Sequence, residues 1–392
     1  MASKALTIKK AINTRLKGDY VKLASEVEDM PKVTTGLLSL DEQTNGGLPM
    51  GFPISFQGRK SVGKSAFTYM MSGRAVDQYG GEVLLLQSEK GFDTEWAKQC
   101  GLPIKDTIYF EGDDLRKSLQ LILDVLQTDK PTCVILDSLS MLSGNPTGSL
   151  VDSKSRGERA VPINEFFRKL VHAMDREHPP LFMYIEHLHP VMDKPGLTTT
   201  GGETKGYANG MEIRLTIESF LWVECQSYSD EKAKVKTPVQ SNVLWEITKS
   251  KSCPFKGRGT YQLGLRETYF CKPGEINDYN ELVVRGILNG HIKKAGSWFS
   301  IIDTGEKYQG LEKLKGSIDS STLKEIVLRP RPEGGEEHSP VKRLPTKATK
   351  RGRGAKGGLP RGDMADGTQV NGEGEPEAAE GVAGEDQAGG SE

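Results

Sequence analysis

The sequence predicts an α/β protein whose core is a mainly parallel β-sheet covered by helices. Between about residues 33 and 270, apolar strand-like runs alternate with segments of helical spacing, which is typical of βαβ units. The runs are almost continuously apolar, as strands buried on both faces of a sheet must be. A glycine-rich segment at residues 58–65 joins one of these strands to a helix. These three observations together predict the fold class.

The individual elements follow from the same periodicities. Strands are expected at 52–56, 82–87, 133–136, 181–185 and 243–248, and core helices at 66–79, 115–127 and 163–174. A helical lead (1–32) should contain helices at 5–16 and 23–30, and a small α/β module (271–328) should contain helices at 280–287 and 318–327 and a turn into a strand at 295–300. The lead is interpreted either as a solvated cap or as a segment that docks on a neighbouring subunit.

Composition narrows the class of protein. A chain of 392 residues suffices for one large or two ordinary domains and a tail. Its five cysteines are widely spaced and form no C-x-x-C pair, which argues against a zinc site or disulfide framework and for a reducing compartment. Neither a secretory signal nor an apolar run long enough to cross a membrane is evident. We therefore expect a cytoplasmic protein with no membrane partner.

The last segment, residues 329–392, is expected to be disordered because it has almost no apolar side chains. Nine Lys and Arg face three Glu in residues 331–361, whereas residues 362–392 carry nine Asp and Glu and neither Lys nor Arg. A basic arm followed by an acidic tail suggests nucleic-acid contact by the arm and competition by the tail. A solubilising tail with no specific role is the alternative.

The glycine-rich segment fits the pattern G-x-x-x-x-G-K-[ST] of a phosphate-binding P-loop. Its residues are Gly58, Arg59, Lys60, Ser61, Val62, Gly63, Lys64 and Ser65. The backbone N–H groups of such a loop and the N-terminus of the following helix surround phosphates. Lys64 is expected to contact the β- and γ-phosphates of ATP, and Ser65 to bind Mg²⁺. Since every pattern position is filled in a strand–loop–helix setting, a chance glycine-rich turn is the weaker interpretation.

Polar residues at the ends of three other strands would complete a nucleotide site. Asp137 ends an apolar strand, as a Walker B carboxylate that holds Mg²⁺ would. Glu89 follows a second strand and could activate water, although a surface glutamate would fit the same pattern. Glu186 and His187 end a third strand, where a polar group could hydrogen-bond the γ-phosphate. With His189, His187 could instead mark a metal site, but no third ligand is evident nearby.

Three segments are candidates for contacts beyond the nucleotide. The stretch 195–209 is rich in glycine and threonine and could hold phosphates without reading bases, although an ordinary flexible loop has the same composition. The charged stretch 151–159 is interpreted as a solvated turn rather than a DNA contact. Lys249 and Lys251 close a strand on one side of it. They form either a solvated basic edge or cations for a neighbouring subunit's nucleotide site.

Taken together, these segments resemble the RecA family of DNA recombinases over about residues 33–328. The resemblance is carried by residues 45–51, 89–93, 198–202, 249–256 and 295–300, besides the P-loop. P-loops occur in many families, but the order and spacing of these segments is much more specific. The resemblance implies a RecA-like ATPase core.

The resemblance also implies roles for single residues. Glu89 would activate water, and Asp93 and Trp96 would contact the adenine, Trp96 by stacking. His187 stands where many members have Gln, a γ-phosphate sensor coupled to the second DNA loop. The DNA contacts implied by the resemblance are Asn164, Arg168, Thr200, Gly201 and Gly202, and the lysines implied to act on a neighbour's nucleotide are Lys249 and Lys251.

Several positions depart from the family pattern. Residues 159–163 lack the usual first DNA loop, and Glu203 stands where Asn is frequent. Lys60 replaces a Glu that helps to link neighbouring subunits in the family. These departures indicate a divergent member, consistent with a phage-type protein. The resemblance thus implies the cytoplasm of a bacterial or phage-infected host cell.

We therefore expect an ATP- and Mg²⁺-dependent DNA recombinase, that is, a DNA-dependent ATPase that forms a helical filament on single-stranded DNA and pairs it with homologous duplex DNA. A single-strand-binding protein or a loader would be a further partner. Two alternatives remain: a RecA-core motor such as a ring helicase, and a non-catalytic mediator switched by nucleotide. The segments 198–202 and 295–300 argue against the motor, and Lys64, Glu89 and Asp137 argue against the mediator.

Overall fold

The computed structural model describes residues 3–144, 157–174, 176–190, 197–199, 204–226, 234–253 and 256–330. The helices are α1 (Lys4–Leu16), η1 (Ala24–Glu26), α2 (Leu38–Gln43), α3 (Lys64–Tyr79), α4 (Thr94–Gln99), η2 (Ile104–Asp106), α5 (Leu115–Thr128), α6 (Gly157–Ala173), α7 (Thr204–Ala208), α8 (Tyr279–Leu288), α9 (Leu311–Ser317) and α10 (Ser320–Leu328). The strands are β1 (Lys32–Val33), β2 (Leu48–Pro49), β3 (Pro53–Gly58), β4 (Val83–Gln87), β5 (Thr107–Glu111), β6 (Cys133–Asp137), β7 (Leu181–His187), β8 (His189–Pro190), β9 (Leu197–Thr198), β10 (Met211–Gln226), β11 (Lys234–Ser250), β12 (Arg258–Gly264), β13 (Ile276–Asn277), β14 (Ile292–Ala295), β15 (Trp298–Ile301) and β16 (Lys307–Gln309). Within these residues, no helix is both long and apolar enough to span a bilayer.

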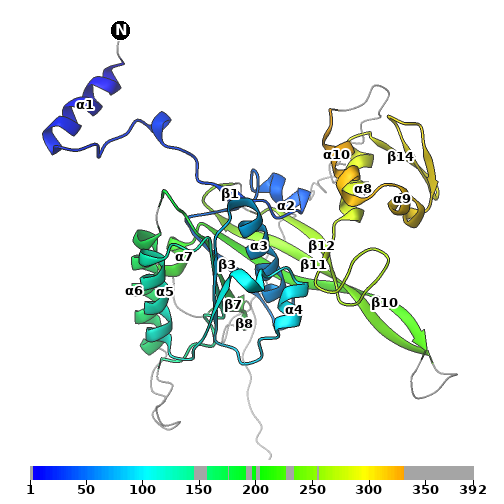
Figure 1. Ribbon diagram of the computed structural model, residues 1–392, viewed down its shortest axis with the longest axis horizontal. Helices are drawn as coiled ribbons and strands as arrows, with labels where there is room; N and C mark the ends of the chain where they lie inside the picture. Colours follow the sequence, from blue (N-terminus) through cyan, green and yellow to red (C-terminus); the bar gives the residue numbers. More distant parts are fainter. Residues whose placement is uncertain are drawn as a thin grey trace, which may run out of the picture. The chain divides into compact units, whose positions relative to one another are not determined.

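The core is a nine-stranded sheet in the order β13-β12-β11-β10-β3-β7-β6-β4-β5 (Figure 1). The six strands from β10 to β5 are parallel to their neighbours, and β11, β12 and β13 are added antiparallel. Register brings the ends of the parallel strands together, with Gly58 opposite His187 and Gln87 opposite Asp137. This topology confirms the predicted α/β class with a mainly parallel sheet.

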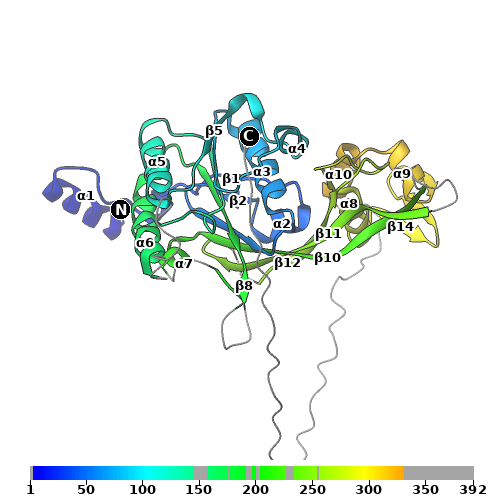
Figure 2. The same ribbon diagram turned by 90° about the horizontal axis from the view of Figure 1, so that it is seen from below.

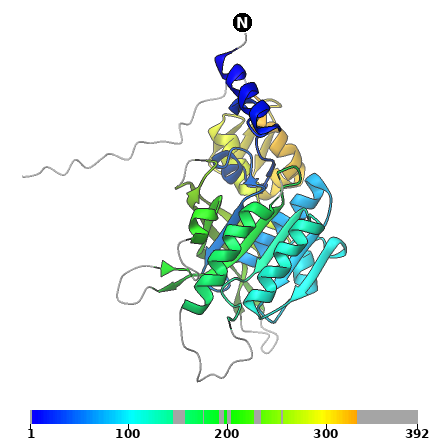
Figure 3. The ribbon, with the colours of Figure 1, turned by 90° about the vertical axis from the view of Figure 1, so that its left-hand side faces the viewer.

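The parallel strands are buried on both faces because their alternate residues pack against different helices. In β4, Val83 and Leu85 join the cluster that contains the apolar side of α3, whereas Leu84 and Leu86 join the cluster of α5 and α6. Apolar residues of α5 recur at helical spacing from Leu115 onward and are buried on one side. Figure 3 shows α5 and α6 next to each other over one face of the sheet. The near-continuous apolar runs of the sequence are therefore explained by two-sided burial.

The longest strands, β10 and β11, form a hairpin that extends well past the rest of the sheet (Figures 1 and 2). β10 pairs with β3 only from Met211 to Leu215, and β11 pairs with β12 from Gln240 to Glu246. The sequence predicted only the part of β11 at 243–248. The hairpin was missed because its outer half exposes apolar side chains on both faces, so it lacks the alternation typical of a half-buried strand.

Residues 279–328 contain the second, smaller sheet, β14-β15-β16, and the helices α8, α9 and α10. Their apolar side chains form a cluster of their own, which also includes Leu38 of α2. The expected helices at 280–287 and 318–327 are present as α8 and α10, and the turn into a strand is a hairpin through Gly296, which has a φ of +61°. The domain boundaries proposed from the sequence stay predictions.

Two secondary-structure predictions were wrong. The helix expected at 23–30 is only the short η1, because Val27 is already extended and Pro31 disfavours helical backbone in the residue before it. The loop expected at 195–209 contains β9 and the helix α7.

The helix α6 begins six residues earlier than expected, at Gly157, and continues through Pro162. The predictions for 151–156, 200–203, 254–255 and the tail from 331 fall outside the described residues.

Candidate nucleotide-binding site

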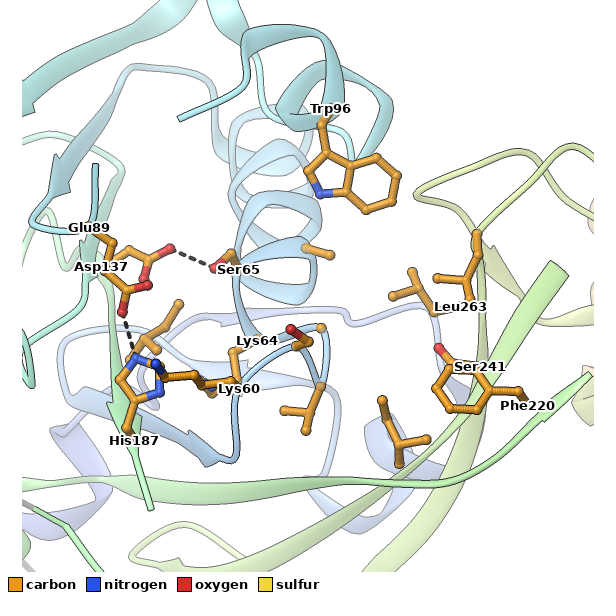
Figure 4. A pocket seen from close by; sticks show the side chains of 17 residues that line it. Lys60, Lys64, Ser65, Glu89, Trp96, Asp137, His187, Phe220, Ser241 and Leu263 are labelled. Atoms are coloured by element: carbon orange, nitrogen blue, oxygen red, sulfur yellow. Dashed lines mark hydrogen bonds and ion pairs between the residues drawn. The ribbon is translucent and has the colours of Figure 1, made fainter. Parts of the chain in front are cut away.

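A cavity of about 400 Å³ lies at the carboxyl ends of β3, β4, β6 and β7 (Figure 4). Its polar end is formed by Lys60, Lys64, Ser65, Glu89, Asp137 and His187. Its apolar end is formed by Trp96, Ile217, Phe220, Ser241, Leu263 and Leu265. Ligands of open parallel sheets bind beyond the carboxyl ends of the strands, and this cavity has that position.

The P-loop joins β3 to α3 with backbone that suits an anion. Ser61 and Gly63 have φ angles of +59° and +87°, and a side chain at Gly58 would collide with the Leu215 carbonyl oxygen, 2.7 Å from the position of a Cβ. No side chain caps the N-terminus of α3, so its first N–H groups are available to a phosphate. The segment therefore has the geometry that its sequence pattern predicted.

Lys64, the first residue of α3, is buried at the floor of this loop. Its Nζ donates to the carbonyl oxygens of Gly58 at 3.2 Å and Arg59 at 2.7 Å. Burial lowers the pKa of Lys64, and the nearby carboxylates of Asp137 and Glu89 oppose that shift. A phosphate group would give this ammonium stronger partners than these two carbonyl oxygens.

Asp137 ends β6 as a buried carboxylate that is 3% exposed. It accepts a hydrogen bond of 2.7 Å from the Ser65 hydroxyl. Burial raises the pKa of Asp137 to about 6, and the charge of Glu89 adds to the increase. A carboxylate and a hydroxyl are oxygen ligands of the kind that Mg²⁺ prefers, and a cation would relieve the cost of burying this charge. Ser65 and Asp137 therefore fit the predicted Mg²⁺ site.

Glu89 lies beside Asp137 and is held by two side chains. Its Oε1 is 2.6 Å from His187 Nε2 and accepts a hydrogen bond of 2.9 Å from the Ser138 hydroxyl. Burial acts to raise the pKa of Glu89, but these two hydrogen bonds and the charge of His187 outweigh it, so the pKa is lowered. Sequence reasoning missed Ser138, although its place directly after Asp137 was an available signal.

His187 is the last residue of β7 and has a second ring nitrogen, Nδ1, that is buried and has no hydrogen-bond partner among the described residues. Its backbone N–H donates to the Ser140 hydroxyl at 2.9 Å. The ring is thus fixed on the polar end of the cavity, with Glu89 as its hydrogen-bond partner (Figure 4).

At the apolar end, Trp96 of α4 and the side chains of Phe220 and Leu263 lie on different sides of the cavity (Figure 4). Asp93 does not line the cavity. It caps α4 instead, and its Oδ1 accepts a hydrogen bond of 2.9 Å from the Trp96 backbone N–H. No sequence pattern indicated Phe220 or Leu263, because they reach the cavity through the antiparallel part of the sheet.

Lys249 and Lys251 do not line this cavity. Lys249 lies opposite Glu212 in the β10–β11 register, and burial lowers its pKa. Lys251 follows the end of β11 and borders a separate cavity of about 660 Å³, where its Nζ donates to the Ala208 carbonyl oxygen at 3.2 Å. Neither lysine contacts the nucleotide cavity of its own chain.

Of the predicted DNA contacts, Asn164 and Arg168 are one helical turn apart on α6, and Arg168 is exposed. The Asn164 Oδ1 is buried and has no partner among the described residues. Thr200, Gly201 and Gly202 are outside the described residues. The DNA-binding roles of all five stay predictions.

Residues 4–252, well over half of the chain, match the RecA N-terminal domain family. The chain belongs to the RecA family. The P-loop cavity at the carboxyl ends of the parallel strands is therefore the cavity of a RecA-like core, and both the resemblance and the fold class predicted from the sequence are confirmed.

The chain is similar to proteins of several bacteria that are named Protein RecA, at low sequence identity. Protein RecA of Cytophaga hutchinsonii is 27% identical over 306 residues, which cover 75% of this chain and 79% of that protein. Protein RecA of Lactococcus lactis subsp. cremoris is 27% identical over 311 residues, covering 77% and 75%. Protein RecA of Methylobacterium sp. is 24% identical over 311 residues, covering 77% and 79%. At these identities, the role of each site residue has to be argued from its own geometry.

Proposed function

We propose that the protein is an ATP-dependent DNA recombinase that assembles on single-stranded DNA and pairs it with homologous duplex DNA. The observation that carries the proposal is the position of Glu89, ionised and hydrogen-bonded to His187, beside the P-loop lysine and the Ser65–Asp137 pair. Membership of the RecA family and similarity to proteins named RecA support it.

ATP would bind with its phosphates in the P-loop and its base between Trp96 and the apolar wall. Lys64 would leave the carbonyl oxygens of Gly58 and Arg59 for the β- and γ-phosphates. Ser65 and Asp137 would hold Mg²⁺, which neutralises phosphate charge when it is bound. Trp96 would stack on the base, since aromatic faces bind bases without hydrogen bonds.

Glu89 would then act as the base that orients and deprotonates the attacking water. Its lowered pKa keeps it ionised at neutral pH, and its Oε1 is shared by His187 and the Ser138 hydroxyl. If His187 turned to the γ-phosphate, Oε1 would keep only the Ser138 hydroxyl and could accept a hydrogen bond from water. ATP binding would thus make Glu89 accessible to water and change the contacts at the end of β7. The two effects follow because His187 would have different partners with and without bound ATP.

DNA and neighbouring subunits would meet this core at other surfaces. Asn164, Arg168 and the segment Thr200–Gly202 would hold the DNA backbone, so that base pairing supplies sequence specificity. Lys249 and Lys251, which lie outside their own chain's cavity, would neutralise charge in a neighbour's site.

Joint-molecule formation tests the proposal directly. The full chain is mixed with ATP, Mg²⁺, a labelled single strand and a homologous supercoiled duplex, and a heterologous duplex and a Lys64→Ala protein serve as controls. Joints that require homology, ATP and Lys64 are the expected result. DNA-stimulated hydrolysis without joints would instead favour a RecA-core motor, and full joint formation by Lys64→Ala would favour a mediator that does not use hydrolysis.

A further inference from the structure

The short helix α7 is fastened to β7 by two buried polar contacts that the nucleotide site does not use. At the start of α7, Lys205 forms an ion pair with Glu186. Just after its end, the Asn209 Oδ1 accepts a hydrogen bond of 2.9 Å from the Tyr184 hydroxyl. Glu186 is 1% exposed and Lys205 5%. Both contacts are made by the strand that ends in His187, so α7 follows the position of that strand.

The ion pair also joins two other segments of the core. The second carboxylate oxygen of Glu186 accepts a hydrogen bond of 2.7 Å from the hydroxyl of Ser55, on the strand that leads into the P-loop. The Lys205 Nζ also donates to the Thr199 Oγ1 at 2.7 Å. Thr199 directly precedes the predicted DNA-contacting segment, and Lys205 lies in α7, three residues after Gly202. One buried pair therefore connects the P-loop strand, the γ-phosphate-sensing strand and both flanks of that segment.

A buried ion pair adds little net stability to the contact between α7 and β7. Taking two charges out of water costs about as much as their attraction returns, and an apolar pair of similar size is often as stable. Burial raises the pKa of Glu186, which Lys205 and Ser55 oppose, and the charge of Glu212 also acts to raise it. Once the pair is buried, however, separating the two charges is costly. It is therefore a stiff connection between β7 and α7, whereas an apolar contact could slide.

We propose that the Glu186–Lys205 ion pair couples the nucleotide state at His187 to the position of Thr199 and α7, and so to DNA affinity. The inference rests on the proposed function. When His187 changes its partner from Glu89 to a phosphate, the end of β7 moves, and Glu186 is the next residue along the strand. Lys205 follows Glu186 because the two charges stay together. Both are positioning residues, since neither lines the nucleotide cavity.

The test measures how much nucleotide tightens DNA binding. The affinity of the full chain for a fluorescent oligo(dT) is measured by anisotropy, with Mg²⁺, in the presence and absence of a non-hydrolysable ATP analogue. The double variant Glu186→Gln with Lys205→Met removes both charges at nearly constant side-chain size. We expect its affinity for the analogue to stay close to that of the wild type, and the tightening of DNA binding to fall by about tenfold, within the usual range of coupling between sites.

Three further variants separate coupling from a structural role. Lys205→Arg keeps the charge and should keep most of the coupling. Thr199→Val removes one contact and should lower the coupling by about twofold to threefold with an unchanged melting temperature. The matched control removes the exposed pair of Glu224 and Lys234, whose charged atoms are 3.3 Å apart on the hairpin, and should leave the coupling unchanged.

The outcomes distinguish the inference from the proposed function. If the double variant folds and keeps the full tightening, the ion pair does not couple the sites and the inference is wrong. If the double variant does not fold, Thr199→Val decides, and unchanged coupling in that variant also overturns the inference. If wild-type protein binds DNA equally well with and without the analogue, the proposed function fails and the inference fails with it.

Discussion

The two ends of the nucleotide cavity are built in different ways. The polar end uses the last residues of neighbouring parallel strands, such as Asp137 and His187, together with the P-loop that leaves β3. The apolar end uses Trp96 from a short helix, and Phe220 and Leu263 from the antiparallel extension of the sheet. Charged groups at the polar end are costly to bury without an opposite charge, whereas apolar side chains at the other end gain free energy when a ligand covers them. The two ends are therefore expected to contribute differently, the polar end to chemistry and the apolar end to affinity.

The largest expected effect is the loss of turnover at the polar end. In Glu89→Gln, the carboxamide can accept the hydrogen bonds of Ser138 and His187 but cannot take a proton from water, so DNA-stimulated ATP hydrolysis should fall at least about 100-fold. Affinities for ATP and DNA should be retained. Phosphate release and nucleotide titration measure the two properties. The control is Glu82→Gln, at an exposed position before β4. Unchanged hydrolysis in Glu89→Gln would show that Glu89 is not the base that activates water.

The second effect concerns the free energy of unfolding and the buried charge of Asp137. The pKa of Asp137 is raised from 3.8 to about 6, so between these pH values the folded chain binds more protons than the unfolded chain, and stability falls as pH rises. Because the side chain of Asp137→Asn cannot ionise, this variant should be more stable than the wild type at neutral pH. Without nucleotide or Mg²⁺, its free energy of unfolding should be higher by about 1–3 kcal/mol. Urea unfolding should show this difference shrinking as pH falls from 6 toward 3.8. A less stable variant at neutral pH would contradict the argument.

At the apolar end we expect a change in affinity rather than in chemistry. Trp96→Ala removes the stacking face and should weaken ATP binding by about tenfold, with little change in the maximal rate of hydrolysis. Trp96→Phe should restore most of the affinity. The exposed Trp298 provides a matched control, and an equal loss in Trp298→Ala would show that the effect is not specific to the cavity.

The smallest effect tests whether the hairpin is part of the site. Phe220 and the next residue, Leu221, are both exposed, but only Phe220 lines the cavity. Phe220→Ser should weaken ATP binding by about twofold to threefold through the loss of apolar contact, and Leu221→Ser should not. Equal affinities for the two variants would limit the base site to Trp96 and the residues of β12.

The polar end of the cavity could be predicted from the sequence. The glycines of the P-loop restrict the backbone within eight residues, and Asp137, Glu89 and His187 each follow an apolar run typical of a buried strand. Because parallel strands end at one edge of a sheet, these residues were expected to meet, and the structure brings all three to one cavity. The class of fold followed from the same runs.

The apolar end of the cavity and the contacts of α7 with β7 could not be predicted from the sequence. Phe220 and Leu263 reach the cavity through the pairing of β10, β11 and β12, which depends on a register between residues far apart in the sequence. Glu186 and Lys205 are ordinary charged residues in the sequence, and their pairing appears only when α7 packs on β7. The helix wrongly expected at 23–30 is a local error instead, since Val27 is extended and a proline follows at position 31. Short-range backbone preferences and the ends of the apolar runs thus made the polar end of the cavity predictable, whereas long-range strand pairing and helix packing determined its apolar end and the contacts of α7.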